Sequence, residues 1–284
     1  MSTPSSPDSV APTSSDASGS SPRVAVVTGA ARGIGLAIAR WFLAQGHDVA
    51  LLDVDAPTLH AACKSLQADH RSLPQRLRFI AVEVDVSQED QVQRPHDAVM
   101  AQWGHVDALV NNAGVASFSP ALQTPFAEWR RIMATNLDGV FLCSQAFGRT
   151  MVDQGKGAVV NIASISGMRA SLLRVAYGTS KAAVMHLTRQ HAAEWGALGV
   201  RVNAICPGPV ETAMAKQVHS AAIRRDYHDA IPLGRYGSEE EMAQTVGFLC
   251  SDQASYINGQ CLGVDGGFDA IGIGLPTFRN DMGL

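Results

Sequence analysis

Short apolar runs alternate with longer amphipathic stretches from Arg23 onward. Most of these runs are continuously apolar, which indicates strands that are buried on both faces. They cover residues 23–29, 48–55, 77–86, 106–114, 157–164, 200–208 and 261–267. Between them lie helical candidates of ten or more residues, beginning with "GLAIARWFLAQG". This alternation predicts an α/β fold, a doubly wound sheet of about seven parallel strands with helices on both faces.

The pattern predicts a single domain over residues 23–284, because no internal repeat and no linker follows residue 23. Residues 1–22 consist almost entirely of Ser, Pro, Ala, Thr, Asp and Gly. Such a segment buries too little apolar surface to offset its ordering entropy, so we expect a disordered tail. Residues 268–284 extend beyond the last strand. They either reach a neighbouring subunit's active site or pack on their own subunit.

One proline conflicts with the helical pattern. Pro95 lies inside the segment 88–104, where a helix is expected between two strands. Proline costs about 3 kcal/mol in a helix interior. The sequence therefore predicts either a kink at Pro95 or a helix that begins near it.

Composition and charge exclude several classes of protein. The 284 residues are 46% hydrophobic and 17% charged, as in an ordinary globular protein. The net charge of −4 argues against binding to nucleic acid or to an anionic membrane surface. The five cysteines and nine histidines form neither a CxxC nor an HExxH pattern, so we expect no metal site and no disulfide framework. Scattered thiols among apolar neighbours favour a cytoplasmic protein.

A glycine-rich segment follows the first predicted strand. "VVTGAARGIGLAIA" places Gly29, Gly33 and Gly35 between that strand and the first helix. Glycines at this point permit a tight turn and let the backbone approach a pyrophosphate at the helix N-terminus. The sequence thus predicts a dinucleotide site here.

The choice between NAD and NADP depends on the acid that ends the second strand. Asp53 can accept hydrogen bonds from the adenosine ribose hydroxyls and repel a 2′-phosphate. Two unit charges about 4 Å apart interact by about 4 kcal/mol at an effective dielectric constant of 20. Arg32 in the glycine loop would favour the phosphate instead. We expect the fixed acid to prevail over the mobile arginine, and therefore NAD as cofactor.

Five motifs in a fixed order resemble the short-chain dehydrogenase/reductase family. They are "TGAARGIG", "NNAG" at 111–114, "NIASISG" at 161–167, "YGTSK" at 177–181 and "CPG" at 206–208. The resemblance covers residues 23–267 approximately. It implies a Rossmann-type fold, a nicotinamide cofactor and a homotetramer that packs through the helices near 126–153 and 177–196.

The resemblance also implies a catalytic set. Tyr177 matches the family's acid/base, Ser164 the residue that holds the substrate oxygen, and Asn136 a residue that serves a proton relay. Lys181 lies one helical turn after Tyr177, so both side chains share a face. A phenol has a pKa near 10, and an ammonium about 4 Å away supplies the order of 4 kcal/mol needed to lower it by three units. An oxidised nicotinamide adds a second positive charge.

Further matches concern cofactor binding. Asp85 and Val86 resemble the pair beside the adenine, and Thr212 a residue that reaches the carboxamide or a phosphate. The full set implied to bind the dinucleotide is Gly29, Arg32, Gly33, Ile34, Gly35, Asp53, Asp85, Val86, Asn112, Ala113, Gly114, Tyr177, Lys181, Pro207, Gly208, Val210 and Thr212.

These residues predict reversible hydride transfer between NAD(H) and a secondary alcohol or ketone, with a polyol, sugar or related hydroxy compound as the small-molecule substrate. An NADPH-dependent 3-oxoacyl-thioester reductase or other carbonyl reductase is an alternative, which Asp53 disfavours. A non-catalytic NAD(H)-binding regulatory protein is a second alternative. The segment between Pro209 and Gly234 is expected to cover the substrate. Arg169 and Arg174 either meet an anionic substrate group or are solvated loop residues.

Overall fold

A seven-stranded sheet forms the centre of the computed structural model, which describes residues 21–69 and 78–272. All strand pairs are parallel, in the order β3-β2-β1-β4-β5-β6-β7. The predicted doubly wound fold is therefore confirmed. The strands are β1 (Val24–Thr28), β2 (Asp48–Asp53), β3 (Phe79–Glu83), β4 (Ala108–Asn111), β5 (Gly157–Ile162), β6 (Val200–Pro207) and β7 (Cys261–Val264).

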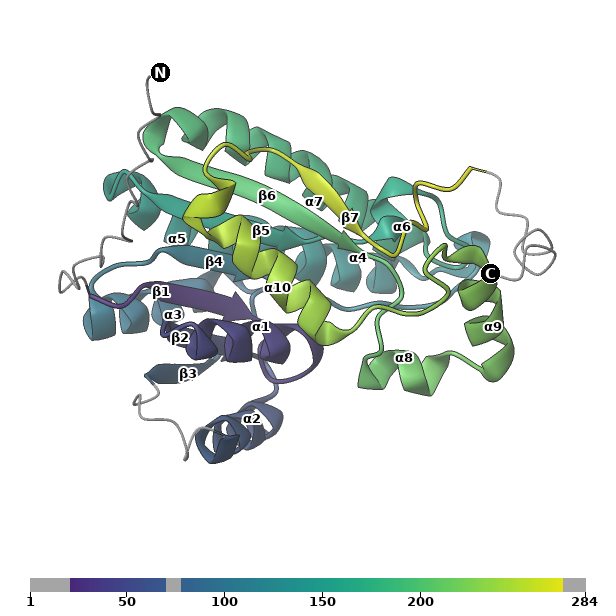
Figure 1. The fold of residues 1–284 in the computed structure, drawn as a ribbon, viewed down its shortest axis with the longest axis horizontal. Coiled ribbons are helices and arrows are strands. Elements are labelled where there is room, and N and C mark those ends of the chain that lie inside the picture. Colours follow the sequence, from purple (N-terminus) through teal and green to yellow (C-terminus); the bar gives the residue numbers. More distant parts are fainter. Residues whose placement is uncertain (1–20, 70–77, 273–284) are drawn as a thin grey trace, which may run out of the picture.

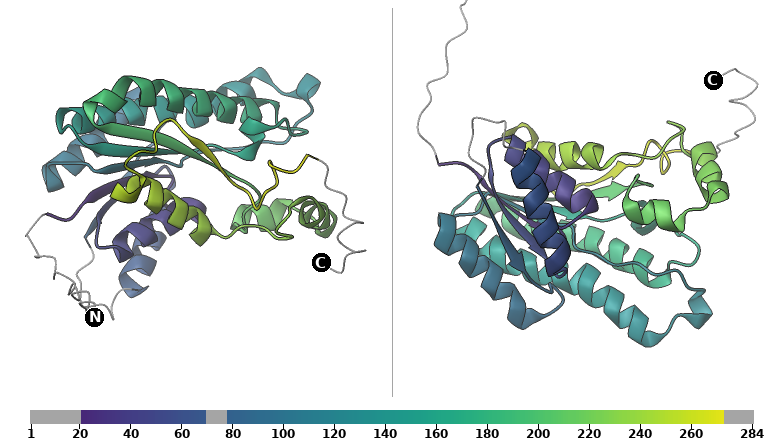
Figure 2. Two further views of the ribbon diagram at one scale, coloured as in Figure 1. Left: turned by 45° about the horizontal axis from the view of Figure 1, so that its top comes forward. Right: turned by 90° about the horizontal axis from the view of Figure 1, so that it is seen from below.

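Helices cover both faces of the sheet (Figures 1 and 2). One face packs against α1 (Gly33–Ala44), α2 (Ala56–Asp69) and α10 (Glu239–Cys250). The other packs against α3 (Glu89–Trp103), α5 (Gly139–Asp153) and α7 (Val175–Trp195). Alternate residues of β1 serve the two cores, because Ala25 and Val27 face α1 whereas Val24 and Val26 face the opposite layer. This two-sided burial explains the continuously apolar strands.

Several short elements extend from the carboxyl ends of the strands. They are η1 (Ala121–Gln123), α4 (Phe126–Met133), η2 (Ala134–Asp138), α6 (Ile165–Met168), α8 (Ala213–Val218) and α9 (Ala221–Ala230). Two more, η3 (Gly196–Leu198) and η4 (Asp252–Ala254), precede β6 and β7. The segment expected to cover the substrate thus contains two helices, which Figure 1 shows standing apart from the sheet. Thr212 and Ser220 cap them by accepting backbone hydrogen bonds from Ala215 and Ile223.

Helix α3 passes through Pro95 without ending, so the prediction of a helix that begins near this proline is wrong. The helix begins at Glu89, where two acidic residues occupy its first turn and favour its positive end. Gly104 ends it with a left-handed φ of 75°. The helix therefore forms although Pro95 has no backbone N–H to donate within it.

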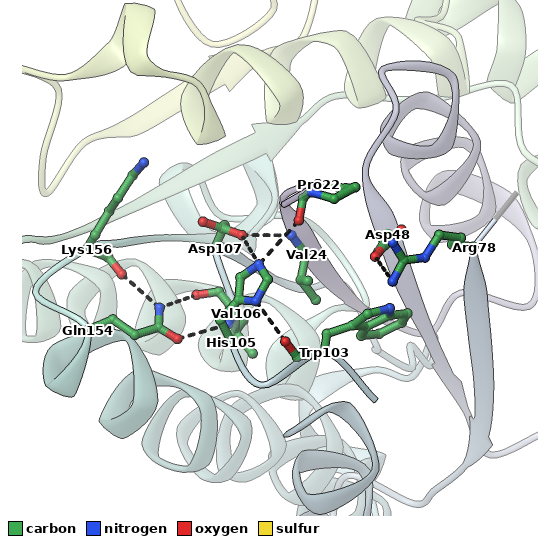
Figure 3. A network of polar contacts seen from close by, with 10 residues as sticks. All are labelled: Pro22, Val24, Asp48, Arg78, Trp103, His105, Val106, Asp107, Gln154 and Lys156. Atoms are coloured by element: carbon green, nitrogen blue, oxygen red, sulfur yellow. Dashed lines mark hydrogen bonds and ion pairs between the residues drawn. The ribbon is translucent and has the colours of Figure 1, made fainter. Parts of the chain in front are cut away.

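The amino ends of the central strands are joined by polar contacts (Figure 3). The Asp107 carboxylate accepts a hydrogen bond of 2.7 Å from the Val24 backbone N–H. The Gln154 side chain accepts from the Val106 N–H and donates to the Val106 carbonyl, at 3.0 and 2.7 Å. Asp48 at the start of β2 pairs with Arg78 at 3.0 Å. These contacts fix the edge of the sheet opposite the predicted site.

Parts of two expectations fall outside the described residues. These are residues 1–20 of the predicted tail and residues 273–284 of the C-terminal extension. Within residues 21–69 and 78–272, no helix is both long enough and apolar enough to cross a bilayer.

Candidate active site

The glycine loop after β1 has the conformation that the sequence predicts. Gly29 and Gly33 take φ values of 62° and 60°, which side chains rarely adopt. Gly35 allows a close approach, because a Cβ there would lie 2.1 Å from the Gly29 carbonyl oxygen. Arg32 makes no side-chain cap at the start of α1. The first N–H groups of this helix, which include Ile34, therefore lack a side-chain acceptor and can receive a phosphate.

Asp53 is buried at the end of β2 and holds two backbone segments. Its carboxylate accepts hydrogen bonds of 3.0 Å from the N–H of Ala31 in the glycine loop and from the N–H of Asp55. Asp55 also pairs with Arg32 at 3.1 Å. The arginine that was expected to compete for a 2′-phosphate is thus partnered by a second acid at the same place.

A threonine joins the ends of β1 and β4. Thr28 Oγ1 accepts hydrogen bonds of 3.0 Å from the N–H groups of both Asn112 and Ala113. The Asn112 amide donates to the carbonyls of Thr28 and Gly29, at 2.9 and 3.0 Å. The contacts shown for Asn112 are therefore structural. Sequence reasoning missed Thr28, although its place directly before Gly29 was a signal.

Ser164 and Ser166 face different partners. Ser164 lies at the end of β5 and caps α6, where its Oγ accepts from the Ser166 N–H at 3.1 Å. The same hydroxyl lies near enough to Tyr177 to lower the pKa of that phenol through a hydrogen bond. The Ser166 hydroxyl instead contacts Ser171 at 3.2 Å. The structure brings Ser164, and not the nearby Ser166, to Tyr177.

The electrostatics of Tyr177 differ from the expectation. Burial raises the pKa of the Tyr177 phenol above its usual value, and the hydrogen bond to Ser164 and the charge of Arg174 oppose this only in part. The Lys181 ammonium lies 5.8 Å from the centre of the Tyr177 ring. In the protein without cofactor the expected lowering of this pKa is therefore not seen: desolvation is the largest influence on the phenol, and the opposing influences come from Ser164 and Arg174.

Lys181 is buried, and burial lowers its pKa to about 8. Its Nζ donates a hydrogen bond of 2.7 Å to the Ile162 carbonyl at the end of β5. A Cβ placed on Gly114 would lie 3.5 Å from Lys181 Nζ and 3.4 Å from Asn136 Oδ1. Gly114 thus lies against both polar groups without a side chain of its own, next to α7, the helix that carries Tyr177.

Asn136 lies in η2, a π-helical turn between α4 and α5. Its side chain is fully buried, accepts from the Val115 N–H at 2.8 Å and donates to the Val115 carbonyl at 2.9 Å. It also donates to Ser180 Oγ at 3.0 Å, and that hydroxyl donates to the Tyr177 carbonyl at 2.7 Å. Asn136 therefore connects the loop after β4 to α7, the helix that carries Tyr177 and Lys181. Sequence reasoning missed Ser180, whose position inside "YGTSK" was its only signal.

The remaining matched residues lie along the same edge. Asp85 accepts hydrogen bonds from the N–H and the hydroxyl of Ser87, at 3.0 and 2.7 Å. The neighbouring Val86 is buried. Pro207 ends β6, and Gly208 donates its N–H to the Val264 carbonyl at 3.0 Å. Val210 is buried, and Thr212 begins α8.

The arrangement fits a dinucleotide that extends across the carboxyl edge of the sheet. The glycine loop offers an uncapped helix N-terminus at one end. At the other end, Ser164, which caps α6 just after β5, lies near Tyr177 and Lys181 of α7. Doubly wound sheets bind ligands at the point where the strand order reverses, which here lies between β1 and β4. Among the described residues, no group of three His, Cys, Asp or Glu side chains is placed to hold a metal ion.

Comparisons with known proteins agree with this class of fold and site. A family model described as Enoyl-(Acyl carrier protein) reductase matches residues 29–269. The chain is 40% identical to a 2-(R)-hydroxypropyl-CoM dehydrogenase of Xanthobacter autotrophicus over 88% of this chain and 99% of that protein. It is 42% identical to a galactitol 2-dehydrogenase (L-tagatose-forming) of Cereibacter sphaeroides over 86% and 94%.

A solved structure of a gluconate 5-dehydrogenase from Burkholderia cenocepacia, in complex with NADP and tartrate, is also similar. It superposes with a TM-score of 0.81 at 32% identity, over 88% of this chain and 96% of that chain. The fold and site define a dinucleotide-dependent oxidoreductase. The chain belongs to the short-chain dehydrogenase/reductase family.

Proposed function

We propose that this protein is an NAD-dependent dehydrogenase that interconverts a secondary alcohol and its ketone. The substrate class is a polyol, a sugar or a related hydroxy compound. The observation that carries the proposal is the meeting of Ser164 with Tyr177, above a buried Lys181, at the same sheet edge as the glycine loop. The similar galactitol 2-dehydrogenase supports the substrate class.

Each side chain has a separate task in the proposed reaction. A nicotinamide dinucleotide supplies hydride-transfer chemistry when bound. Ser164 Oγ holds the substrate oxygen, and Tyr177 gives or takes the proton on that oxygen. Lys181 donates a hydrogen bond to the Ile162 carbonyl. Because the pKa of Lys181 is about 8, its side chain carries a positive charge near the phenol at pH values below 8. Asn136, whose amide contacts both backbone groups of Val115 and the Ser180 hydroxyl, helps to return that proton toward solvent.

The raised pKa of Tyr177 bears on the direction of catalysis. A protonated phenol is ready to protonate an alkoxide, so it acts as an acid when a ketone is reduced. Alcohol oxidation needs a phenolate, which burial disfavours in the protein alone. We therefore infer that oxidation depends on the positive charge of the oxidised cofactor and requires a higher pH than reduction. Equal pH optima in the two directions would contradict this.

We propose NAD as the preferred cofactor, although the similar gluconate 5-dehydrogenase was solved with NADP. The support is the Asp53 carboxylate, which backbone hydrogen bonds from Ala31 and Asp55 hold at the end of β2. A 2′-phosphate about 4 Å away would be repelled by about 4 kcal/mol before screening by solvent, so NAD is favoured by roughly a hundredfold to a thousandfold. Asp53→Asn removes this charge and should therefore reduce the ratio of kcat/KM for NAD⁺ to kcat/KM for NADP⁺.

The experiment is a matrix of initial rates. NAD⁺ and NADP⁺ are offered with polyols, sugars, hydroxy acids and steroid alcohols, and NADPH is offered with a 3-oxoacyl thioester. The proposal predicts the highest kcat/KM for NAD⁺ with a member of the polyol, sugar or hydroxy-acid set. Comparable efficiency with NADP⁺ would refute the cofactor assignment. A preference for NADPH and the thioester would favour the reductase alternative.

We further propose a cytoplasmic homotetramer. All five cysteines are free thiols, which suits a reducing compartment. The helices expected at the interface present Phe141, which is 43% exposed, whereas Met185 is buried in its own subunit. A subunit interface through α5 would cover Phe141. Light scattering that shows a stable monomer would contradict the tetramer.

A further inference from the structure

Arg174 lies three residues before Tyr177 and directly follows a residue with a strained backbone, Leu173. Its backbone forms a parallel bridge with Ser119, in the loop that follows β4, and the Ser119 N–H donates to the Leu173 carbonyl at 3.1 Å. Leu173 has a φ of 63°, the only positive value at a non-glycine position in the described part of the chain. For an L-residue with a side chain this backbone conformation is unfavourable, because its Cβ crowds the following carbonyl oxygen. Backbone strain of this kind is concentrated at sites where a side chain must be aimed.

Two aromatic rings hold the guanidinium beside the catalytic phenol. Arg174 Cζ lies 4.1 Å from the centre of the Phe118 ring and 5.0 Å from the centre of the Tyr177 ring. Contacts with ring faces satisfy the flat sides of a guanidinium by cation–π attraction. Its five N–H donors lie in the plane of the group, so they remain directed past the rings. A substrate whose oxygen contacts Tyr177 extends into the same region.

Arg174 differs from the neighbouring arginines in the partners of its guanidinium. Arg169, on the same loop, donates to the Phe268 carbonyl at 2.7 Å and lies 3.9 Å from the Asp269 carboxylate. Arg224 on α9 pairs with Glu211. Among residues 21–69 and 78–272, no carboxylate pairs with Arg174 and no acceptor receives a hydrogen bond from its guanidinium. A half-buried cation with a full set of unused donors therefore stands next to the reacting centre.

We propose that Arg174 binds an anionic group of the substrate, a carboxylate or a similar oxyanion, and thereby selects anionic hydroxy compounds. This inference rests on the proposed dehydrogenase function and narrows its substrate class. Arginine matches an oxyanion with two parallel hydrogen bonds, whereas a lysine offers a single point charge. The residue determines specificity. It takes no part in the transfer of the proton or the hydride.

The test uses Arg174→Gln, with Arg169→Gln as a matched control that removes the same charge from the same loop. The substrates are 3-hydroxybutanoate, 4-hydroxypentanoate and 5-hydroxyhexanoate, each compared with its neutral methyl ester. This series moves the carboxylate away from the carbinol carbon in steps. For at least one acid, Arg174→Gln should lower kcat/KM by about 10- to 100-fold, chiefly through KM. The ester should change by less than threefold, and Arg174→Lys should give an intermediate loss.

The ester separates binding from an effect on Tyr177, because the charge of Arg174 also lowers the pKa of that phenol. Equal losses for acid and ester, or an equal loss in Arg169→Gln, would overturn the proposal. So would a wild-type enzyme that turns over each ester as efficiently as its acid.

Equilibrium binding distinguishes failure of this inference from failure of the proposed function. Calorimetry measures the Kd of 4-oxopentanoate and of its methyl ester in the presence of NADH. Binding of the acid that weakens at least tenfold in Arg174→Gln would support the anion site even if no alcohol in the series were oxidised. An acid that does not bind more tightly than its ester, or whose Kd is the same in both proteins, would contradict the site even if the ester were a good substrate.

Discussion

Asn136→Ala removes the side chain that connects the loop after β4 to α7, the helix that carries Tyr177. The native amide bonds both backbone groups of Val115, at 2.8 and 2.9 Å, and the Ser180 hydroxyl at 3.0 Å. Alanine leaves the Val115 N–H and carbonyl without these partners. The same loop contains Gly114, which lies against Lys181. The substitution should therefore affect both stability and catalysis.

The loss in stability can be estimated from these contacts. Each buried backbone group left without a partner costs about 1–3 kcal/mol. Val115 is only partly buried, so water offsets some of this cost and a total of about 2–4 kcal/mol is expected for its two groups. For a domain of this size each kcal/mol lowers Tm by about 2–4 °C. Asn136→Ala should therefore melt roughly 4–16 °C below the wild-type protein.

Asn258→Ala is the matched control. Asn258 accepts from the Val202 N–H at 2.8 Å and donates to the Ala192 carbonyl at 3.0 Å, so it makes the same pair of backbone bonds away from the reacting centre. Both variants should lose comparable stability in calorimetry or urea titration. Only Asn136→Ala should also lose kcat, by tenfold or more, at a temperature where both remain folded. A drop in Tm of less than 2 °C, or equal kcat in the two variants, would refute this reasoning.

Two further predictions follow from packing and burial. Gly35→Ala places a Cβ 2.1 Å from the Gly29 carbonyl oxygen and 2.4 Å from Asn112 Nδ2, so the glycine loop must shift. The affinity for NADH, measured by fluorescence titration, should therefore fall at least tenfold. Unchanged affinity would contradict the close approach. Burial lowers the pKa of Lys181 from 10.5 to about 8, so in that pH range the unfolded chain binds a proton that the folded chain lacks. This group's contribution to the free energy of unfolding therefore rises between about pH 8 and 10.5, and Lys181→Met should lack that rise relative to wild type in parallel urea titrations. Parallel pH profiles for the two proteins would contradict the lowered pKa.

The fold could be read from the sequence because its signals are local. Seven continuously apolar runs correspond to the seven strands, and the residues at their carboxyl ends include the matched motifs. The family resemblance also pointed to the pairing of Ser164 with Tyr177, and both lie close after local elements, one as the cap of α6 and the other in the first turn of α7.

Properties that depend on packing between distant segments could not be predicted in this way. The direction of the Tyr177 pKa shift depends on how deeply neighbouring elements bury the phenol. Arg169 and Arg174 looked alike in sequence, and only the fold shows that Asp269 lies beside one and Phe118 beside the other. The helix around Pro95 continues because its buried face packs against the sheet, a contact that the local sequence does not show.

Tyr177→Phe tests the central claim most directly, because it removes one hydroxyl and leaves the ring that contacts Arg174. The measurement pairs steady-state kcat/KM for the best alcohol with the Kd for NADH. If Tyr177 carries the proton, kcat/KM falls at least a hundredfold, equivalent to about 2.7 kcal/mol or more, whereas Kd stays within threefold. Turnover like that of the wild-type enzyme, with the cofactor still bound, would contradict the account.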